Sequence, residues 1–132
     1  LSDLPRLLPQ ADVVCSVLPS TTQTAGIGDQ AFFDTMRDGA YFANAGRGDL
    51  VDQRALVEAL ASGHLSGAAL DVCTPEPLPA ESPLWDAPNL LLTPHVSGQF
   101  HLAVTLDNIV GIAAENLAHL AAGEALRNHV NA

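Results

Sequence analysis

The sequence predicts an α/β fold in which short buried strands lie parallel in one sheet. Two observations favour this fold class. Short apolar runs alternate with segments of helical periodicity along most of the chain, which is typical of helices packed on a parallel sheet. Two of these runs, residues 68–70 and 90–92, end abruptly in a polar or ionisable residue followed closely by proline or glycine. Buried parallel strands end in this way where they open onto a site.

The first part of the chain predicts a short helix and a strand. Residues 2–10 have the composition of the end of a helix, with Ser2 as the candidate N-cap. The β-branched run over residues 12–17 favours a strand, which stops at Pro19. The polar residues that follow Pro19 indicate a loop.

A helix, a strand and a second helix are predicted next. Residues 29–36 fit a short helix, and its inward face would consist of Phe32, Phe33 and Met36. A second strand is expected over residues 40–45. Asp52 is typical of an N-cap, and Gly63 is typical of the residue that ends a helix. We therefore expect a helix from Asp52 to about residue 62.

The remaining residues predict two further strands and a long helix. Residues 66–72 and 89–93 are interpreted as strands, joined by a proline-rich crossing over residues 75–88. Apolar residues at helical spacing predict a helix over about residues 98–122, which Gly123 ends. We expect the apolar stripe of this helix to be core; it consists of Leu102, Leu106, Ile109, Ala113, Leu117 and Leu120.

One expected feature is missing from the sequence. A doubly wound dinucleotide-binding domain normally begins with a strand, a Gly-x-Gly-x-x-Gly turn and a helix, with an acidic residue about 20 positions later. None of these occurs here, and the chain opens inside a helix. We therefore expect residues 1–123 to be the second half of such a domain, without its first βαβ unit. Residues 124–132 would form a tail towards a substrate domain outside the chain.

Composition excludes several classes of function. The 132 residues carry a formal net charge of −10, and all five basic residues are arginines. With so few cations, we expect no nucleic-acid or anionic-membrane partner. No apolar run approaches the roughly 18 residues that cross a bilayer, and the start has no signal-peptide character. Cys15 and Cys73 lack metal-ligand spacing, so we expect reduced thiols in a cytoplasmic protein and no metal site.

Three residues that can carry chemistry follow predicted strands. Arg47 lies in a glycine-rich loop, Glu76 lies between two prolines, and His95 follows a Thr-Pro pair. Because parallel strands end at one sheet edge, we expect the three side chains to converge there, together with Asp71. Each of these residues also has a purely structural interpretation. Arg47 would be a surface arginine, and Glu76 would keep its loop soluble. His95 would be a histidine bonded at a strand end, and Asp71 would cap a strand end.

Several motifs in order carry a resemblance. Residues 18–19 with Thr24, 44–48 with 51–52, 71–72 with 76–77, and 94–95 with 97–98 together resemble the D-isomer-specific 2-hydroxyacid dehydrogenase family. The resemblance runs from about residue 12 to residue 131. Within the family, residues 78–79, 82–85 and 92–95 are most similar to the glyoxylate and hydroxypyruvate reductases.

The resemblance implies a fold, an activity and a set of site residues. It implies a Rossmann-type domain in a homodimeric oxidoreductase, which transfers a hydride between NAD or NADP and a small 2-keto or 2-hydroxy acid. The implied catalytic residues are Arg47, Glu76 and His95. The implied cofactor-binding residues are Leu18, Pro19, Ser20, Thr24, Ala45, Gly46, Arg47, Asp71, His95, Ser97 and Gly98. Asp71 would hold the nicotinamide carboxamide. The chain departs from the family pattern at Cys73, where an aromatic residue is usual, and at the Thr74-Pro75 pair.

The side-chain chemistry suits reduction of a 2-keto acid. His95 fits the proton donor, Glu76 fits the group that orients its ring and favours its protonated form, and Arg47 fits a clamp for the substrate carboxylate. We expect these 132 residues alone to be inactive. The alternative is an NAD(H)-sensing, non-enzymatic binding protein or corepressor of the same fold. Formate or phosphite oxidation is disfavoured, because formate dehydrogenases carry glutamine at the position of Glu76. The choices between NAD and NADP, and among keto acids, stay open.

Overall fold

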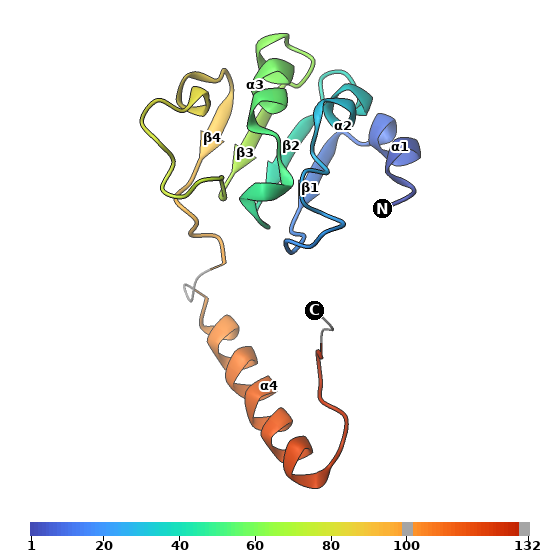
Figure 1. Ribbon diagram of the computed structural model, residues 1–132, viewed down its shortest axis with the longest axis vertical. Helices are drawn as coiled ribbons and strands as arrows, with labels where there is room; N and C mark the ends of the chain where they lie inside the picture. The colour runs from blue at the N-terminus through green and yellow to red at the C-terminus, as the bar shows by residue number, and fades with distance from the viewer. Residues whose placement is uncertain (99–101, 130–132) are drawn as a thin grey trace. The chain divides into compact units, whose positions relative to one another are not determined.

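The computed structural model describes residues 1–98 and 102–129. The chain divides into two compact units, Leu1–Ser97 and Gly98–Ala132 (Figure 1). The first unit contains the sheet and every residue discussed below as part of the candidate site except Gly98. The expected boundary between a domain over residues 1–123 and a tail over residues 124–132 stays a prediction.

The first unit is built on a four-stranded parallel sheet. Its strands are β1 (Val13–Ser16), β2 (Tyr41–Asn44), β3 (Gly67–Leu70) and β4 (Leu90–Leu92), in the order β1-β2-β3-β4. The register aligns the last residues of the strands in one row, Ser16, Asn44, Leu70 and Leu92. The parallel α/β fold expected from the sequence is confirmed, and all four strands end at the same edge.

Helices α2 (Gln30–Thr35) and α3 (Gln53–Ala61) cover one face of this sheet (Figure 1). Asp29 caps α2 by accepting a hydrogen bond from the Phe32 N–H, and Asp52 caps α3 by accepting from Arg54 and Ala55. Each cap satisfies backbone donors that the first turn of a helix leaves unpaired. The predicted cap at Asp52 is therefore confirmed.

Other segments differ from their predicted form. The first helix is the single turn α1 (Leu4–Leu7), and its N-cap is Asp3, which makes no side-chain cap bond. Ser2 as a cap was wrong, because Pro5 fixes the start of the helix further along the chain. Short 3₁₀ turns, which the sequence did not reveal, are η1 (Leu8–Gln10), η2 (Gly48–Leu50) and η3 (Pro83–Asp86).

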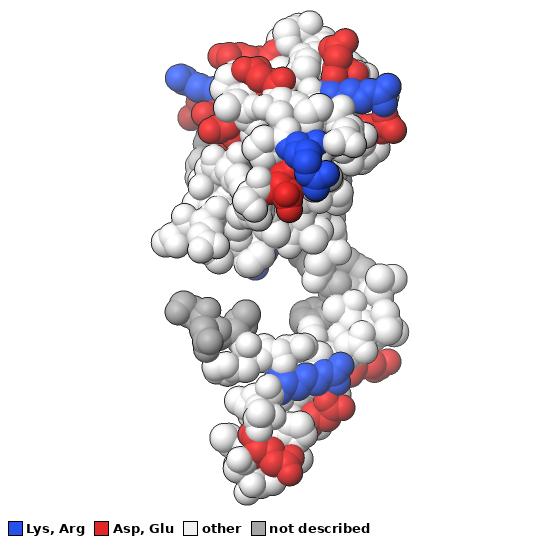
Figure 2. All heavy atoms as spheres, turned by 90° about the vertical axis from the view of Figure 1, so that its right-hand side faces the viewer, with Lys and Arg blue, Asp and Glu red and all other residues white. Residues whose placement is uncertain are grey.

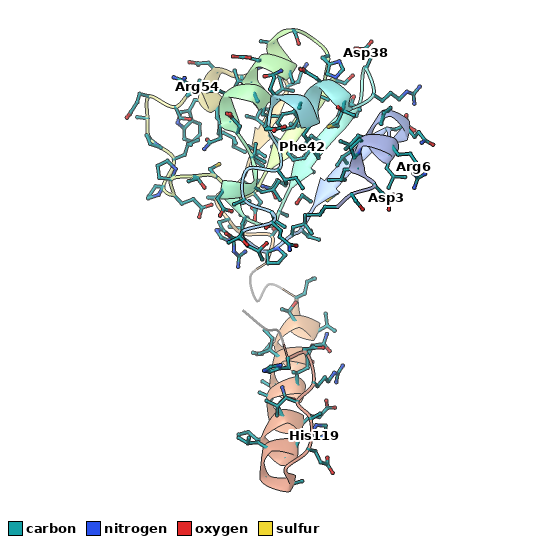
Figure 3. All side chains as sticks on the ribbon, turned by 45° about the vertical axis from the view of Figure 1, so that its right-hand side comes forward. Asp3, Arg6, Asp38, Phe42, Arg54 and His119 are labelled. Carbon is teal, nitrogen blue, oxygen red and sulfur yellow. The ribbon has the colours of Figure 1, made fainter. Side chains whose placement is uncertain are left out.

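The core of the first unit lies between the sheet and the two helices. Phe42 points from β2 into this layer (Figure 3), where it meets Phe33 edge to face with ring centroids 5.2 Å apart. Phe32 completes the aromatic cluster at 5.4 Å from Phe33. Phe33 and Leu56 have no exposed surface. The predicted inward face of α2 is thus confirmed at Phe33 and Met36, whereas Phe32 is partly exposed.

The surface carries charges of both signs. The face shown in Figure 2 has acidic and basic side chains interspersed. Arg37 pairs with Asp12, and Arg6 lies 3.8 Å from Asp3. Both pairs are exposed, so their contribution to stability is small.

The second unit consists of a long helix and a short returning segment. Helix α4 (Ala103–Ala122) ends at Gly123, whose φ of 71° is the left-handed conformation that glycine adopts without strain. The segment after it is tied to the helix, because the Asn116 side chain bonds both the N–H and the carbonyl of Arg127. The Arg127 guanidinium also pairs with Glu115 at 2.7 Å.

Within the second unit, the described residues leave the apolar stripe of α4 exposed. Leu102, Leu106, Ile109, Leu117 and Leu120 are all exposed. Burial of a helix stripe needs a second packed element, and the short segment after Gly123 is too small to supply one. Among the described residues, no helix is both long and apolar enough to cross a membrane.

Replacement of Phe33 tests the packing of this core. Phe33→Ala removes a fully buried ring that touches two other aromatic rings. We expect it to lower the free energy of unfolding by about 3–5 kcal/mol, measured by urea denaturation. Gln23→Ala, an exposed loop substitution, serves as the control and should change it by less than about 0.5 kcal/mol. Equal effects of the two substitutions would contradict the packing described here.

Candidate active site

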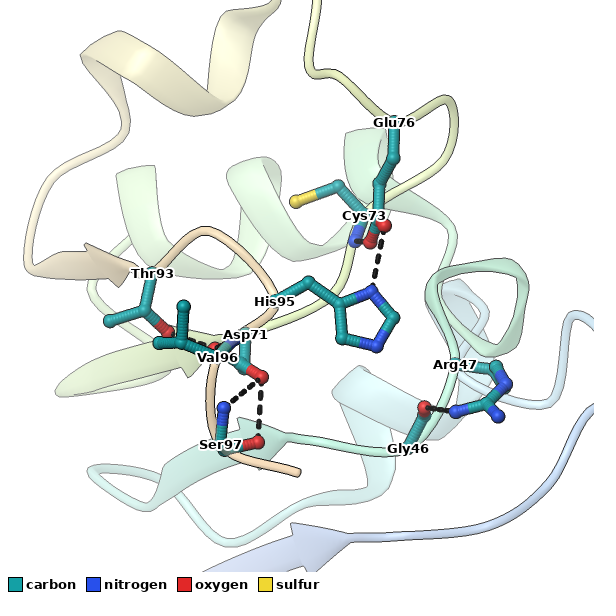
Figure 4. Close-up of polar contacts among 9 residues, drawn as sticks. All are labelled: Gly46, Arg47, Asp71, Cys73, Glu76, Thr93, His95, Val96 and Ser97. Atoms are coloured by element: carbon teal, nitrogen blue, oxygen red, sulfur yellow. Dashed lines mark hydrogen bonds and ion pairs between the residues drawn. The ribbon is translucent and has the colours of Figure 1, made fainter. Parts of the chain in front are cut away.

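The candidate site lies where the chain leaves the ends of the strands. Arg47 follows β2, Glu76 follows β3 and His95 follows β4 (Figure 4). The three side chains line one hollow of about 300 Å³, together with Ser20 from the loop after β1. The convergence expected at this sheet edge is therefore present in the structure.

Glu76 and His95 are in direct contact. The Nδ1 atom of His95 lies 2.8 Å from Oε2 of Glu76, and Oε1 of Glu76 accepts a hydrogen bond from the Cys73 N–H at 2.9 Å. The bond to His95, followed by the bond from Cys73, outweighs the opposing effect of burial and lowers the pKa of Glu76. The carboxylate form therefore persists at neutral pH. Through its contact with Nδ1, it fixes the plane of the imidazole ring.

The loop that carries His95 is held by Asp71. One carboxylate oxygen of Asp71 accepts hydrogen bonds from the Thr93 hydroxyl at 2.5 Å and the Val96 N–H at 2.9 Å. The other accepts from the N–H and hydroxyl of Ser97, at 2.9 and 2.6 Å. These contacts flank His95 on both sides. His95 itself has a φ of 54°, an uncommon left-handed conformation for a residue with a side chain, so the loop needs this support.

These contacts also determine the charge of Asp71. Burial alone would raise its pKa, but the hydrogen bonds from the side chains of Ser97 and Thr93 and from the N–H groups of Val96 and Ser97 outweigh that effect. The pKa of Asp71 consequently lies well below its ordinary range. The group is thus a carboxylate at neutral pH.

Arg47 sits in a turn that fits tightly between two other loops. A Cβ atom on Gly46 would lie 2.5 Å from the carbonyl oxygen of Leu18, and one on Gly48 would lie 2.0 Å from that of Cys73. Only glycine permits such close backbone approach. The Arg47 guanidinium is exposed and donates one hydrogen bond to the Gly46 carbonyl at 2.7 Å.

The loop after β1 contains the remaining predicted cofactor contacts. Thr24 is buried, and its hydroxyl donates to the Pro19 carbonyl at 2.6 Å, which closes the loop on itself. Ser20 donates to Asp49, close to Arg47 in the chain. Because Leu18 packs on Gly46, this loop and the residues after β2 form one continuous edge. Ala45 is exposed on it, whereas Gly98 begins the second unit.

A larger hollow of about 770 Å³ is also lined by Glu76 and His95, but not by Arg47. Its walls are mostly apolar and come from the proline-rich crossing and β4. Trp85 is half exposed there, and its indole N–H donates to the Pro79 carbonyl at 2.8 Å. Trp85 is thus bonded to another residue of the proline-rich crossing.

Two features of the site were missed by sequence reasoning. Thr93 bonds Asp71, and Asn44 bonds the backbone of the Arg47 turn. Asn44 is the last residue of β2, and Thr93 directly follows β4. That position is a usable signal, because a buried polar side chain needs a partner nearby. Among the described residues, no cluster of histidine, cysteine, aspartate and glutamate could hold a metal ion.

Comparison with known proteins yields one family. The model of the D-isomer specific 2-hydroxyacid dehydrogenase NAD-binding domain matches residues 1–97. Glyoxylate/hydroxypyruvate reductase B of Citrobacter koseri is 43% identical over 129 residues, which is 98% of this chain and 39% of the relative. The enzyme of the same name from an Enterobacter species is 41% identical over the same shares. The chain thus spans about two fifths of these relatives' length.

Solved structures show the same likeness. A D-isomer specific 2-hydroxyacid dehydrogenase from Xanthobacter autotrophicus, in complex with NADPH and MES, is 38% identical with a TM-score of 0.87, covering 99% of this chain and 52% of the other. An NADPH-dependent glyoxylate/hydroxypyruvate reductase from Sinorhizobium meliloti, in complex with NADP and sulfate, is 32% identical with a TM-score of 0.84, covering 98% and 42%.

Substitution of Gly48 tests the close packing of the Arg47 turn against the Cys73 backbone. Gly48→Ala places a methyl group onto the Cys73 backbone, so we expect a loss of about 1–3 kcal/mol or more in the free energy of unfolding. Gly111→Ala is the matched control, because its Cβ meets nothing within 4 Å. The control should be neutral or stabilising by up to about 1 kcal/mol. Urea denaturation of both variants distinguishes the two cases.

Replacement of Asp71 tests the anchor of the His95 loop. A carboxylate with a lowered pKa stabilises the fold above its ordinary value of about 3.9, and this contribution is lost as the pH falls through its folded value. Asp71→Asn should therefore be less stable at neutral pH by about 1–3 kcal/mol. Below about pH 4, the stability of the variant should also fall less steeply than that of the wild type.

The measurement is urea denaturation over a series of pH values, with Asp107→Asn, an exposed carboxylate on α4, as the control. Identical pH profiles for Asp71→Asn and the wild type would contradict the role of this anchor.

Proposed function

The chain belongs to the D-isomer specific 2-hydroxyacid dehydrogenase family, and we propose that the whole protein reduces small 2-keto acids to 2-hydroxy acids with a nicotinamide cofactor. Glyoxylate and hydroxypyruvate are the proposed substrates, as the names of its relatives suggest. The observation that carries the proposal is the hollow lined jointly by Arg47, Glu76 and His95, with Glu76 bonded to the imidazole.

The three side chains supply complementary functions. The Arg47 guanidinium pairs with the substrate carboxylate, and its forked donors suit that planar group. The protonated imidazole of His95 donates a hydrogen bond, and then its proton, from Nε2 to the keto oxygen. Glu76 holds the ring in place through its contact with Nδ1. The keto acid gains a hydride at its carbonyl carbon and a proton on its oxygen, so one hydroxy acid forms and one oxidised cofactor is released.

The chain also offers residues that suit the cofactor, NAD or NADP. When bound, the reduced nicotinamide supplies the hydride. The loop of Leu18, Pro19, Ser20 and Thr24 would line its ribose and pyrophosphate, with Ala45, Gly46, Ser97 and Gly98 near the nicotinamide. The fit is supported by the packing of Leu18 on Gly46, which joins two of these groups into one edge. A carboxamide that reached Asp71 would have to share an oxygen already engaged in the His95 loop.

The relatives narrow the remaining choices. The Xanthobacter and Sinorhizobium structures contain NADPH and NADP, which supports NADP in this protein. The acidic charge of −10 supports small-molecule partners and no nucleic acid or membrane partner. A cytoplasmic homodimer completes the proposal for the whole protein. The relatives are named as reductases, which favours catalysis over a purely nucleotide-sensing role.

Steady-state kinetics of the whole protein test this proposal. The wild type should oxidise NADPH or NADH in the presence of glyoxylate or hydroxypyruvate. His95→Gln removes the proton donor and should lower kcat by about 10²–10⁴-fold. His129→Gln, at an exposed histidine in the other unit, serves as the matched control and should leave kcat unchanged. An inactive wild type, or a fully active His95→Gln variant, would contradict the proposed function.

A further inference from the structure

Asn44 is a buried polar residue at the end of β2. Only 1% of its surface is exposed. The register pairs it with Ser16 on one side and Leu70 on the other, so it sits in the row of residues at which the sheet ends. An amide in this position must find hydrogen-bond partners, because burial without them is costly.

Both ends of the Asn44 amide are used on the Arg47 turn. Its Nδ2 atom donates to the Arg47 carbonyl at 2.8 Å, and its Oδ1 atom accepts from the Gly46 N–H at 3.0 Å. The side chain thus bonds the peptide group before Gly46 and the peptide group after Arg47, and so fixes the two-residue segment between them. No other residue type has a donor and an acceptor of this length and geometry.

The same residue is joined to the anchor of the His95 loop. The backbone carbonyl of Asn44 accepts a hydrogen bond from the Asp71 N–H at 3.0 Å. Asp71 in turn holds the residues on both sides of His95. A short chain of contacts therefore fixes the backbone under Arg47 relative to the backbone under His95.

We infer that Asn44 is the positioning residue for Arg47, holding the base of its side chain at the distance from His95 that a 2-keto acid requires. This inference rests on the proposed function. Gly46 and Gly48 limit how far the turn can move, and Asn44 sets its conformation within those limits. The guanidinium then reaches the substrate through side-chain rotation alone, so the backbone of the turn need not become ordered when the substrate binds.

Substitutions of Asn44 in the whole protein test this role. Asn44→Ala removes both contacts, whereas Asn44→Ser keeps a hydroxyl that can accept from the Gly46 N–H. The control is Asn116→Ala, because Asn116 also bonds one backbone N–H and one backbone carbonyl, both of Arg127, in the other unit. The readouts are the KM for glyoxylate, the KM for NADPH, kcat and the thermal midpoint of unfolding.

We expect Asn44→Ala to raise the KM for glyoxylate by about 10–100-fold, while the KM for NADPH changes by less than about 3-fold. Asn44→Ser should fall between Asn44→Ala and the wild type, and Asn116→Ala should leave all three kinetic constants unchanged. A purely structural role would instead lower the thermal midpoint without this difference between the two KM values.

The outcomes separate the inference from the function on which it rests. A wild type without keto-acid reduction contradicts the proposed function, and the inference with it. An active wild type in which the Asn44 variants match Asn116→Ala contradicts the inference alone. If the alanine variant does not fold, the serine variant decides. If neither folds, Asn44 is a folding residue and the inference is wrong.

Discussion

The arrangement of the site depends on four hydrogen bonds to the Asp71 carboxylate. They fix the residues before and after His95 and so hold that residue in a backbone conformation that a side-chain-bearing residue adopts at a cost. The imidazole can then meet Glu76 at hydrogen-bond distance. Because a carboxylate has about four acceptor positions, these bonds use most of the capacity of Asp71.

The sheet and the loops contribute differently to this arrangement. The parallel strands bring the starting points of the loops into one row, and hydrophobic packing under Phe42 and Phe33 keeps that row rigid. The direction of each loop is set by polar contacts beyond the strands, at Asn44 and Asp71. Arg47 and His95 therefore sit on short loops whose backbones are bonded to the ends of buried strands, which is how a rigid scaffold supports a precise site.

Much of the fold could be predicted from the sequence, because apolar periodicity, and proline or glycine after an apolar run, depend directly on local structure. The strands agreed to within a residue or two, and Asp52 capped its helix as expected. Convergence of Arg47, Glu76 and His95 also followed, since parallel strands share an edge. The contacts of Asp71 and Asn44 with neighbouring loops could not be predicted from the sequence. Each side chain bonds the backbone of a loop, and the path of that loop is known only from the structure. The exposed stripe of α4 shows a further limit: periodicity identifies an apolar face but not the surface that covers it.

The proposed function requires that, in one hollow, Arg47 bind the substrate carboxylate while His95 donates to the neighbouring carbonyl oxygen. The most direct test is a crystal structure of the whole protein with NADP and oxamate, a stable analogue of a 2-keto acid. We expect the analogue's carboxylate on the Arg47 guanidinium and its amide carbonyl oxygen about 2.6–3.2 Å from Nε2 of His95. An analogue bound away from Arg47, or an imidazole separated from Glu76, would contradict the proposed function.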